Sequence, residues 1–141
     1  MRILVLSLLA SLLGSVQMEG RDAQTKGSYV YSLKRFEGKK SLVVVFATSS
    51  KDESFKKTQE ALLGRYAEFR KQGLSVFYVF ESEVGRADDM RLRIEDAADL
   101  RRTFKIDSGE FRVILIDKKG KLKRESKSPM SKEEIDKFLG L

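Results

Sequence analysis

Two short apolar runs constrain the fold of this chain more than any other feature. Residues 41–47 (SLVVVFA) and 74–80 (LSVFYVF) are continuous stretches of β-branched and aromatic residues, which is typical of strands buried on both faces. The segment between them has apolar residues at helical spacing: Phe55, Leu62, Leu63, Tyr66 and Phe69. A strand, a helix of about 20 residues and a second strand predict a βαβ unit with parallel strands.

Capping residues predict where this first helix begins and ends. Ser50 and Glu53 have the spacing of a capping box at a helix start. Gly73 lies just past the predicted end, where a left-handed cap residue is favoured. Upstream, residues 29–36 predict a short strand or turn that leads into the domain.

The second half of the chain predicts a helix followed by a hairpin. Residues 81–90 form a polar connection, and apolar spacing predicts a second helix from about Glu95. Residues 111–116 (FRVILI) predict a third strand. The tetrapeptide 117–120 (DKKG) predicts a turn with glycine at a positive φ, so that residues 121–125 return as an antiparallel edge strand.

Ser131 and Glu134 form a second capping box, and Ile135 and Phe138 give the last helix an apolar face. The predicted order is therefore β-α-β-α-β-β-α, a parallel pair followed by an antiparallel hairpin with helices for both faces of the sheet. This is the order of the thioredoxin fold. The expected fold class is α/β, thioredoxin-like, with a mixed central sheet flanked by helices.

The N-terminus predicts export. Residues 1–17 resemble a signal peptide: Arg2 precedes an apolar stretch at 3–13 that is too short to span a bilayer. The alternative is a buried N-terminal element, and the cleavage site stays open. Residues 18–32 predict a disordered leader and residues 33–141 the folded domain. The expected location is periplasmic or extracellular, without a transmembrane segment.

The residues that are missing limit the chemistry. The chain of 141 residues contains no cysteine, histidine, asparagine or tryptophan. Without cysteine, thiol redox chemistry and disulfides are excluded. Without histidine as well, the usual ligand sets of zinc, copper and haem iron are missing, and a Ser-His-Asp triad is impossible. No catalytic residue, metal site or cofactor is therefore assigned.

The sequence resembles the P-DUDES domain family. The resemblance rests on residues 100–106 and 111–120, on Lys123, and on a C-terminal group consisting of Ser128, Pro129, Met130, Ile135 and Asp136. Residues 42–47 and Gln59 agree less specifically. The family's usual Met- and Arg-containing tail has no counterpart here, so no role of that tail is expected.

P-DUDES domains are found in sushi-repeat-containing X-linked proteins, in the steroid-sensitive coiled-coil matrix protein and in small exported bacterial proteins. The resemblance implies a thioredoxin-like fold related to peroxiredoxins but without their cysteines. For the animal relatives it implies matrix or cell-adhesion roles. It supplies no catalytic residues.

The first candidate site is the loop after the first strand, Thr48, Ser49 and Ser50. In redox-active members of the wider fold this position carries the reactive cysteine. Hydroxyl groups beside a helix N-terminus suit a small anion. The alternative is that Ser50 caps the helix while Thr48 and Ser49 are solvated turn residues. A serine without a nearby histidine has no obvious base, which disfavours nucleophilic catalysis.

The second candidate site is the basic hairpin. Its cations are Lys118, Lys119, Lys121, Lys123, Arg124 and Lys127. One face of an extended strand would carry Lys121, Lys123, Glu125 and Lys127. Such a ribbon suits an anionic glycan, a membrane surface or an acidic protein. The alternative is an edge strand that lysine protects against aggregation.

Other charged groups have simpler interpretations. Arg101, Arg102 and Lys105 on the second helix either extend the basic patch or face water. Nucleic acid is not an expected partner, because aromatic residues are not interleaved with the basic ones. The acidic residues near the second helix start match the helix dipole better than a calcium site: Asp88, Asp89, Glu95, Asp96 and Asp99.

Two hypotheses follow. The first is a non-catalytic exported binding module that presents a basic face to an anionic or protein partner. The second is a cysteine-free reductase or hydrolase with its site at the Thr48 to Ser50 loop, which predicts an enclosed pocket there. The formal net charge of +7 is compatible with both.

Overall fold

The computed structural model describes residues 31–140. The predicted signal peptide at 1–17 and residues 18–30 of the predicted leader lie outside the described residues. Of the segment 29–36, expected to be a strand or turn, the described residues 31–36 form a short 3-10 helix, η1 (Tyr31–Phe36). Within the described stretch, no helix is long and apolar enough to cross a bilayer.

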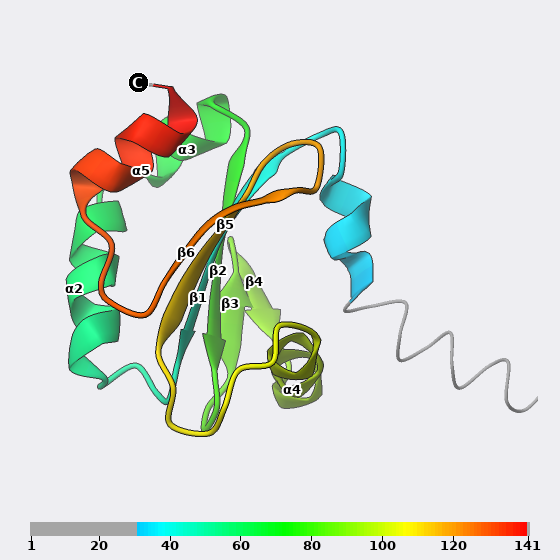
Figure 1. The fold of residues 1–141 in the computed structure, drawn as a ribbon, viewed down its shortest axis with the longest axis vertical. Helices are drawn as coiled ribbons and strands as arrows, with labels where there is room; N and C mark the ends of the chain where they lie inside the picture. The colour runs from blue at the N-terminus through cyan, green and yellow to red at the C-terminus, as the bar shows by residue number, and fades with distance from the viewer. Residues whose placement is uncertain (1–30, 141) are drawn as a thin grey trace, which may run out of the picture. The chain divides into compact units, whose positions relative to one another are not determined.

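A single mixed sheet forms the centre of the fold (Figure 1). Its strands are β1 (Ser41–Ala47), β2 (Leu74–Phe80), β3 (Gly85–Ala87), β4 (Met90–Leu92), β5 (Arg112–Ile116) and β6 (Leu122–Ser126). They lie in the order β4-β3-β2-β1-β5-β6. The pair β1 and β2 is parallel, with Ser41 opposite Leu74, and β5 and β6 form the predicted antiparallel hairpin. The predicted parallel pair and the predicted antiparallel hairpin are confirmed.

The two apolar runs occupy the centre of this sheet. Every residue of β2 is buried, as are residues 42–47 of β1, because both strands have neighbours on each side and helices over each face. Leu42 pairs with Ile116 of β5 in antiparallel register. The hairpin turn after β5 therefore lies near the start of β1, and the Thr48 to Ser50 loop lies at its end. This separates the two candidate sites.

The predicted first helix is two helices. The helices are α2 (Glu53–Leu62), α3 (Tyr66–Lys71), α4 (Ile94–Thr103) and α5 (Lys132–Leu139). The break falls at Gly64, whose φ of +79° is left-handed and therefore ends a right-handed helix. Leu63, expected on the apolar face, is 53% exposed. Phe55, Leu62 and Phe69 are buried as predicted.

The polar connection expected at 81–90 contains the short hairpin of β3 and β4. This hairpin extends the sheet beyond β2, with Arg86 opposite Tyr78. At its turn, Asp88 adopts a φ of +55°, and its Oδ1 accepts a hydrogen bond from the Val76 N–H at 2.8 Å. Strands of three residues leave too little periodicity to be recognised in the sequence.

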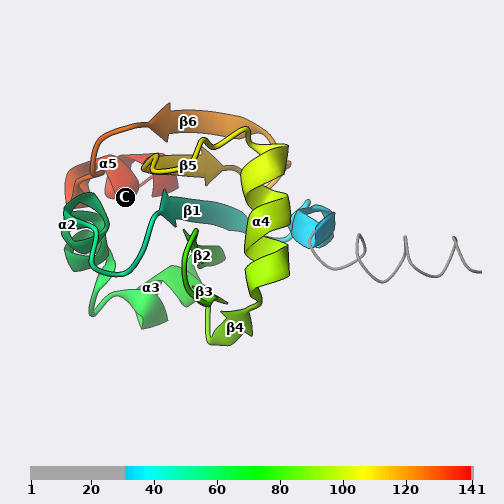
Figure 2. The same cartoon turned by 90° about the horizontal axis from the view of Figure 1, so that it is seen from below.

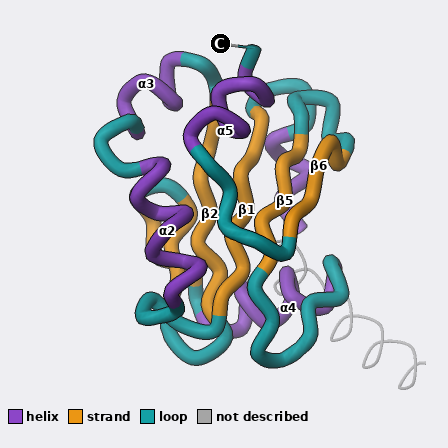
Figure 3. Tube along the Cα trace, turned by 60° about the vertical axis from the view of Figure 1, so that its left-hand side comes forward, coloured by secondary structure: helices purple, strands orange, loops and turns teal. Residues whose placement is uncertain are grey.

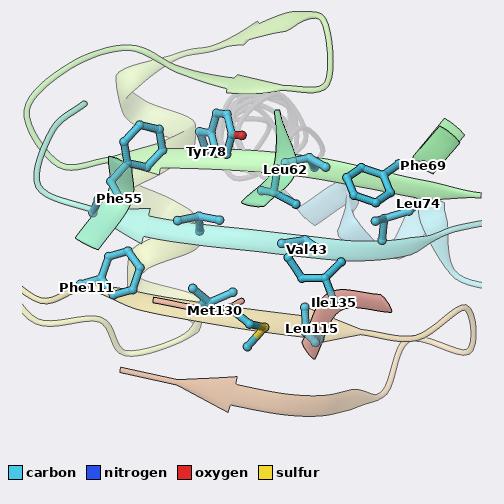
Figure 4. Packing of buried hydrophobic residues seen from close by; sticks show 14 of the residues in the cluster. Val43, Phe55, Leu62, Phe69, Leu74, Tyr78, Phe111, Leu115, Met130 and Ile135 are labelled. Carbon is cyan, nitrogen blue, oxygen red and sulfur yellow. The ribbon is translucent and has the colours of Figure 1, made fainter. Parts of the chain in front are cut away.

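Helices cover both faces of the sheet, as expected (Figure 2). Helices α2, α3 and α5 lie over one face and α4 over the other, an arrangement that Figure 3 shows from a second side. The core under α2 and α5 joins Phe55, Leu62, Val43, Leu115 and Ile135 (Figure 4). On the α4 side, Phe46 packs against Phe104 with ring centroids 5.7 Å apart.

The last helix begins as predicted. The Ser131 hydroxyl accepts from the Glu134 N–H, and the Glu134 carboxylate accepts from the Ser131 N–H at 3.1 Å. This reciprocal pair is a capping box. Hydrogen bonding by the Ser131 N–H is the main cause that lowers the pKa of Glu134, and Arg124 contributes to the same shift.

Candidate functional site

The loop after β1 is organised around Asp52. Its Oδ1 accepts hydrogen bonds from the Ser54 N–H at 2.8 Å and the Phe55 N–H at 3.2 Å, so Asp52 is the N-cap of α2. The capping box predicted at Ser50 and Glu53 is therefore wrong. The physical reason is that α2 begins at Glu53, which leaves Ser50 too early in the chain to reach the first free N–H groups.

The three hydroxyl residues of this loop have separate roles. The Thr48 hydroxyl donates to Asp52 Oδ2 at 3.4 Å. The Ser49 hydroxyl accepts from the Lys51 N–H at 3.1 Å, and Ser50 is exposed. Because the carboxylate of Asp52 already uses the N–H groups of the first helical turn, these hydroxyls do not form a ready anion site.

Two further segments reach the same end of the sheet. Ser82, just after β2, donates its hydroxyl to the Thr48 carbonyl at 2.8 Å. Before β5, the Ser108 hydroxyl and the Gly109 N–H donate to the Glu81 carboxylate at 2.6 and 2.9 Å. These bonds, that from Ser108 above all, lower the pKa of Glu81.

Arg112, at the start of β5, is neutralised by protein carboxylates. Its Nη2 lies 2.5 Å from Glu110 Oε2, and its Nη1 lies 3.5 Å from Glu125 Oε2. The pKa of Glu110 is lowered chiefly by the Asp107 N–H and then by Arg112. Lys127, from the predicted basic hairpin, lies 3.9 Å from the same Glu110 oxygen.

The hairpin turn at 117–120 forms as predicted. Asp117 Oδ1 accepts from the Lys119 and Lys121 N–H groups, both at 2.9 Å, and Gly120 has a φ of +86°. These bonds, led by that from Lys121, lower the pKa of Asp117. The turn therefore has a fixed backbone, with Lys118, Lys119 and Lys121 exposed on it.

The cations predicted on this hairpin do not form one ribbon. The register shifts between Leu115 and Ile116: Leu115 pairs with Arg124 and Ile116 with Leu122. Lys123 lies between the two paired positions. Arg124 forms an ion pair with Glu134 of α5. Lys123 is exposed.

Three connections meet at the hairpin turn, at the end of the sheet where β1 and β2 begin (Figure 1). The Gly38 N–H donates to the Lys118 carbonyl, and the Ser41 N–H donates to the Gly73 carbonyl at 2.8 Å. Glu37 packs directly over Gly120, where a Cβ would lie 2.7 Å from its Cγ. These hydrogen bonds and this packing contact hold the three connections together.

Six lysines on these connections or at the end of α3 define what we call the lysine end: Lys39, Lys40, Lys71, Lys118, Lys119 and Lys121. None forms an ion pair with another residue in the described range. Five are exposed, and Lys40 is half-buried. Sequence reasoning missed Lys39, Lys40 and Lys71, although Lys39 and Lys40 immediately precede the first predicted parallel strand and Lys71 lies three residues before the second.

The lysine end and the Thr48 to Ser50 loop lie at opposite ends of the sheet. The seven residues of β1 separate them, which corresponds to roughly 20 Å of extended chain. The structure thus divides the predicted candidate residues: Lys118, Lys119 and Lys121 belong to one end, and Thr48, Ser49 and Ser50 to the other.

A cavity of 360 Å³ lies between the helices α2 and α3 and the strands β2 and β3. Inside it the hydroxyl oxygens of Tyr66 and Tyr78 are 2.5 Å apart. Burial, followed by the hydrogen bond with Tyr66, raises the pKa of Tyr78. Two of the charged residues that line the cavity form an ion pair, since Arg70 lies 3.4 Å from Asp89.

The charged residues of α4 are largely paired. Arg93 forms two hydrogen bonds with the buried carboxylate of Asp96, at 2.8 and 2.9 Å, and Arg102 forms an ion pair with Asp99. Arg101 neither faces water nor extends the basic patch, because it is buried. No group of three His, Cys, Asp or Glu residues within 31–140 is arranged to hold a metal ion.

Comparisons with solved structures find proteins of similar fold. The fold resembles that of a Plasmodium yoelii thioredoxin peroxidase I, with a TM-score of 0.54 and 16% identity over 77% of this chain and 74% of that one. It also resembles the mitochondrial 2-Cys peroxiredoxin of Plasmodium falciparum, with a TM-score of 0.53 and 12% identity over 77% and 78% of the two chains. At these identities the likeness concerns the fold. A search of curated proteins finds no match.

The sheet order and these structural neighbours together establish a thioredoxin-like fold, as the order of predicted elements indicated. Residues 32–139 match a family described as a domain of unknown function, DUF4174. This match covers nearly the whole of the described chain. The protein is therefore a member of the DUF4174 family, built on a cysteine-free thioredoxin-like fold.

Proposed function

We propose that this chain is a non-catalytic binding module that engages an anionic partner through its lysine end. The observation that carries the proposal is the convergence of six lysines, none of them ion-paired within residues 31–140, on and beside three connections that are hydrogen-bonded to one another. A rigid backbone beneath flexible ammonium groups suits a partner whose charges repeat along a surface or polymer.

The arginines contrast with these lysines. Arg65, Arg112 and Arg124 each lie within an ion pair with a carboxylate. Arg65 lies 2.5 Å from Asp136, and this contact is the main cause that raises its pKa. These arginines join parts of the fold to one another. The lysine end has no such internal partner among the described residues, so its charge remains available to a ligand.

The partner that we favour is a sulfated or otherwise anionic glycan. This choice rests on the proposed export of the chain through residues 1–17, which would place the domain in a periplasmic or extracellular space. The P-DUDES resemblance, which implies matrix roles for animal relatives, supports the same choice. An anionic membrane surface and an acidic protein are the competing partners that the experiment separates.

The alternative enzyme at Thr48 to Ser50 gains no support from the local geometry. The Thr48 hydroxyl contacts the Asp52 carboxylate, which is engaged as the helix cap by two N–H groups. Ser49 is engaged in a local turn. We therefore do not propose catalysis at this loop.

The test is a charge-reversal variant with a matched control. Lys39, Lys119 and Lys121 are changed to glutamate, leaving Lys118, which packs on Gly73, and half-buried Lys40 intact. In the control, the exposed residues Lys57, Lys132 and Lys137 are changed to glutamate, which gives the same net charge. Binding is measured on immobilised heparin, anionic vesicles and an acidic peptide at several salt concentrations.

We expect heparin affinity to fall about 100-fold in the lysine-end variant, since a lysine near an anionic surface contributes roughly 1 kcal/mol. The control variant should lose much less, and binding of the wild type should weaken steeply with salt. Equal losses in both variants would mean that net charge alone drives binding. Retention by vesicles or peptide but not by heparin would reassign the partner.

A further inference from the structure

A second cavity, of 470 Å³, lies beside α4 at the end of the sheet opposite the lysine end. It is bounded by the end of β2, by α4 and by the loop that leads to β5. Arg101, Arg102 and Lys105 line it, and so do Ile94, Ala98 and Phe80. Glu81 and Asp107 line it as well, so cations, carboxylates and apolar side chains share one concave surface.

Arg101 is the unusual residue in this cavity. Its side chain is only 9% exposed. Its Nη2 donates to the Asp107 carbonyl at 2.7 Å and lies 3.5 Å from Glu81 Oε1. Its Nη1 is buried and has no hydrogen-bond partner among residues 31–140. A buried guanidinium N–H without an acceptor is unfavourable. A ligand oxygen that accepts a hydrogen bond from Arg101 Nη1 would remove this cost.

Lys105, which lines the same cavity, adopts a backbone conformation that is unfavourable for a residue other than glycine. The end of α4 closes through hydrogen bonds from the Lys105 N–H to the Arg102 carbonyl and from the Ile106 N–H to the Arg101 carbonyl, at 3.1 and 2.8 Å. This Schellman arrangement places Lys105 at a φ of +55°, where glycine is strongly preferred. The chain thus carries a cation where glycine would be more stable.

The hydrogen bonds of Glu81 show that the rim of this cavity can hold an oxyanion. Its carboxylate takes hydrogen bonds from the Ser108 hydroxyl and the Gly109 N–H and lies beside Arg101. The rim of the cavity therefore already holds one oxyanion of the protein itself. The remaining positive groups, Arg101 Nη1 and exposed Lys105, face no carboxylate within hydrogen-bond distance in the described part of the chain.

The apolar side of the cavity defines the rest of the ligand. Ile94 is 52% exposed, and Ala98 lies four residues later, on the same side of α4. An exposed isoleucine beside buried and exposed cations favours a molecule with a charged group and an apolar body.

We propose that the α4 cavity binds a small organic oxyanion, a carboxylate or phosphate monoester on an apolar or aromatic body. The oxyanion contacts Arg101 and Lys105, and the body covers Ile94. This inference is independent of the lysine end, which lies at the other end of β1 and β2.

The experiment titrates full-length, isotope-labelled protein with phenyl phosphate, benzoate and inorganic phosphate at fixed ionic strength, and reads backbone amide shifts. We expect saturable shifts at residues 94–108. Phenyl phosphate or benzoate should bind about tenfold more tightly than inorganic phosphate, because only they cover apolar surface. Whichever of the two binds more tightly identifies the oxyanion class.

Three variants separate this site from folding effects and from the lysine end. Lys105→Gly should keep or raise the melting temperature, because glycine favours a positive φ, yet weaken phenyl phosphate binding about fivefold. Ile94→Ser should abolish the preference for phenyl phosphate over inorganic phosphate. The lysine-end charge-reversal variant should bind phenyl phosphate like the wild type.

Three results would overturn the proposal. They are the absence of saturable shifts near α4, unchanged affinity in Lys105→Gly, and loss of binding in the lysine-end variant. Shifts near α4 with equal affinity for all three probes would reduce the site to a simple anion contact without selection of an apolar body.

Discussion

Tyr78 is a residue whose ionisation is opposed by its surroundings. It is 6% exposed, and its hydroxyl lies 2.5 Å from that of Tyr66. Burial is the main cause that raises its pKa above the ordinary value of 10.0, and the hydrogen bond with Tyr66 adds to the effect. The site therefore favours the neutral form of Tyr78 over the ionised form.

Stability should therefore fall at alkaline pH in a way that depends on Tyr78. Its folded pKa lies above its unfolded pKa, so its contribution is complete below pH 10.0 and is lost as the pH rises through the folded value. Urea unfolding across this pH range should show a shallower decline in Tyr78→Phe than in the wild type. Tyr66→Phe, which leaves Tyr78 buried, should keep the steep decline. Parallel curves for Tyr78→Phe and the wild type would refute this account.

Of the two predicted capping boxes, one gave the correct start of a helix and the other did not. Ser131 and Glu134 form the expected reciprocal pair, whereas α2 is capped by Asp52. Aspartate and serine are comparable N-caps, so the choice depends on where the preceding loop allows the helix to begin. That loop is fixed by the turn from the Ser49 carbonyl to the Asp52 N–H, which residue spacing does not encode.

Among the secondary-structure elements, the β3–β4 hairpin depends on one close approach. A Cβ at Gly85 would lie 2.1 Å from the Tyr78 carbonyl oxygen of β2. Backbone atoms cannot yield as a flexible side chain would, so Gly85→Ala must push β3 away from β2. We expect a loss of about 1–3 kcal/mol in unfolding free energy, together with faster hydrogen exchange in β3.

Gly109→Ala is the matched control for this prediction. Gly109 has a φ of +81° but open space around its Cα, so alanine there costs only the backbone strain, about 1 kcal/mol. It should leave hydrogen exchange in β3 unchanged. If Gly85→Ala were no more destabilising than Gly109→Ala, the close approach to β2 would not matter.

Elements differed in how far the sequence predicted them. Strands β1 and β2 are long, apolar and buried on both faces, so composition alone identified them. Helices α2 and α3 share one apolar spacing, and the break at Gly64 was missed because a single glycine is tolerated within many helices. The hairpin of β3 and β4 was missed because three-residue strands have no detectable period.

At the scale of the whole molecule, the candidate sites are set by topology. Because β1 and β2 are parallel and β5 is antiparallel to β1, the starts of two strands and one hairpin turn meet at the same end. The hairpin lysines were predictable from the sequence. Their convergence with Lys39, Lys40 and Lys71 depends on contacts between distant segments, which local patterns do not contain.

Whether the lysine end is the binding surface is tested by mapping where an anionic polymer contacts the full-length protein. Short heparin fragments are titrated into isotope-labelled protein, and amide shifts are followed residue by residue. If the lysine end binds the polymer, the shifts are concentrated at residues 38–40, 71–73 and 118–121. Shifts confined to residues 48–52 and 107–110, with the lysine end unaffected, would show that the polymer binds elsewhere.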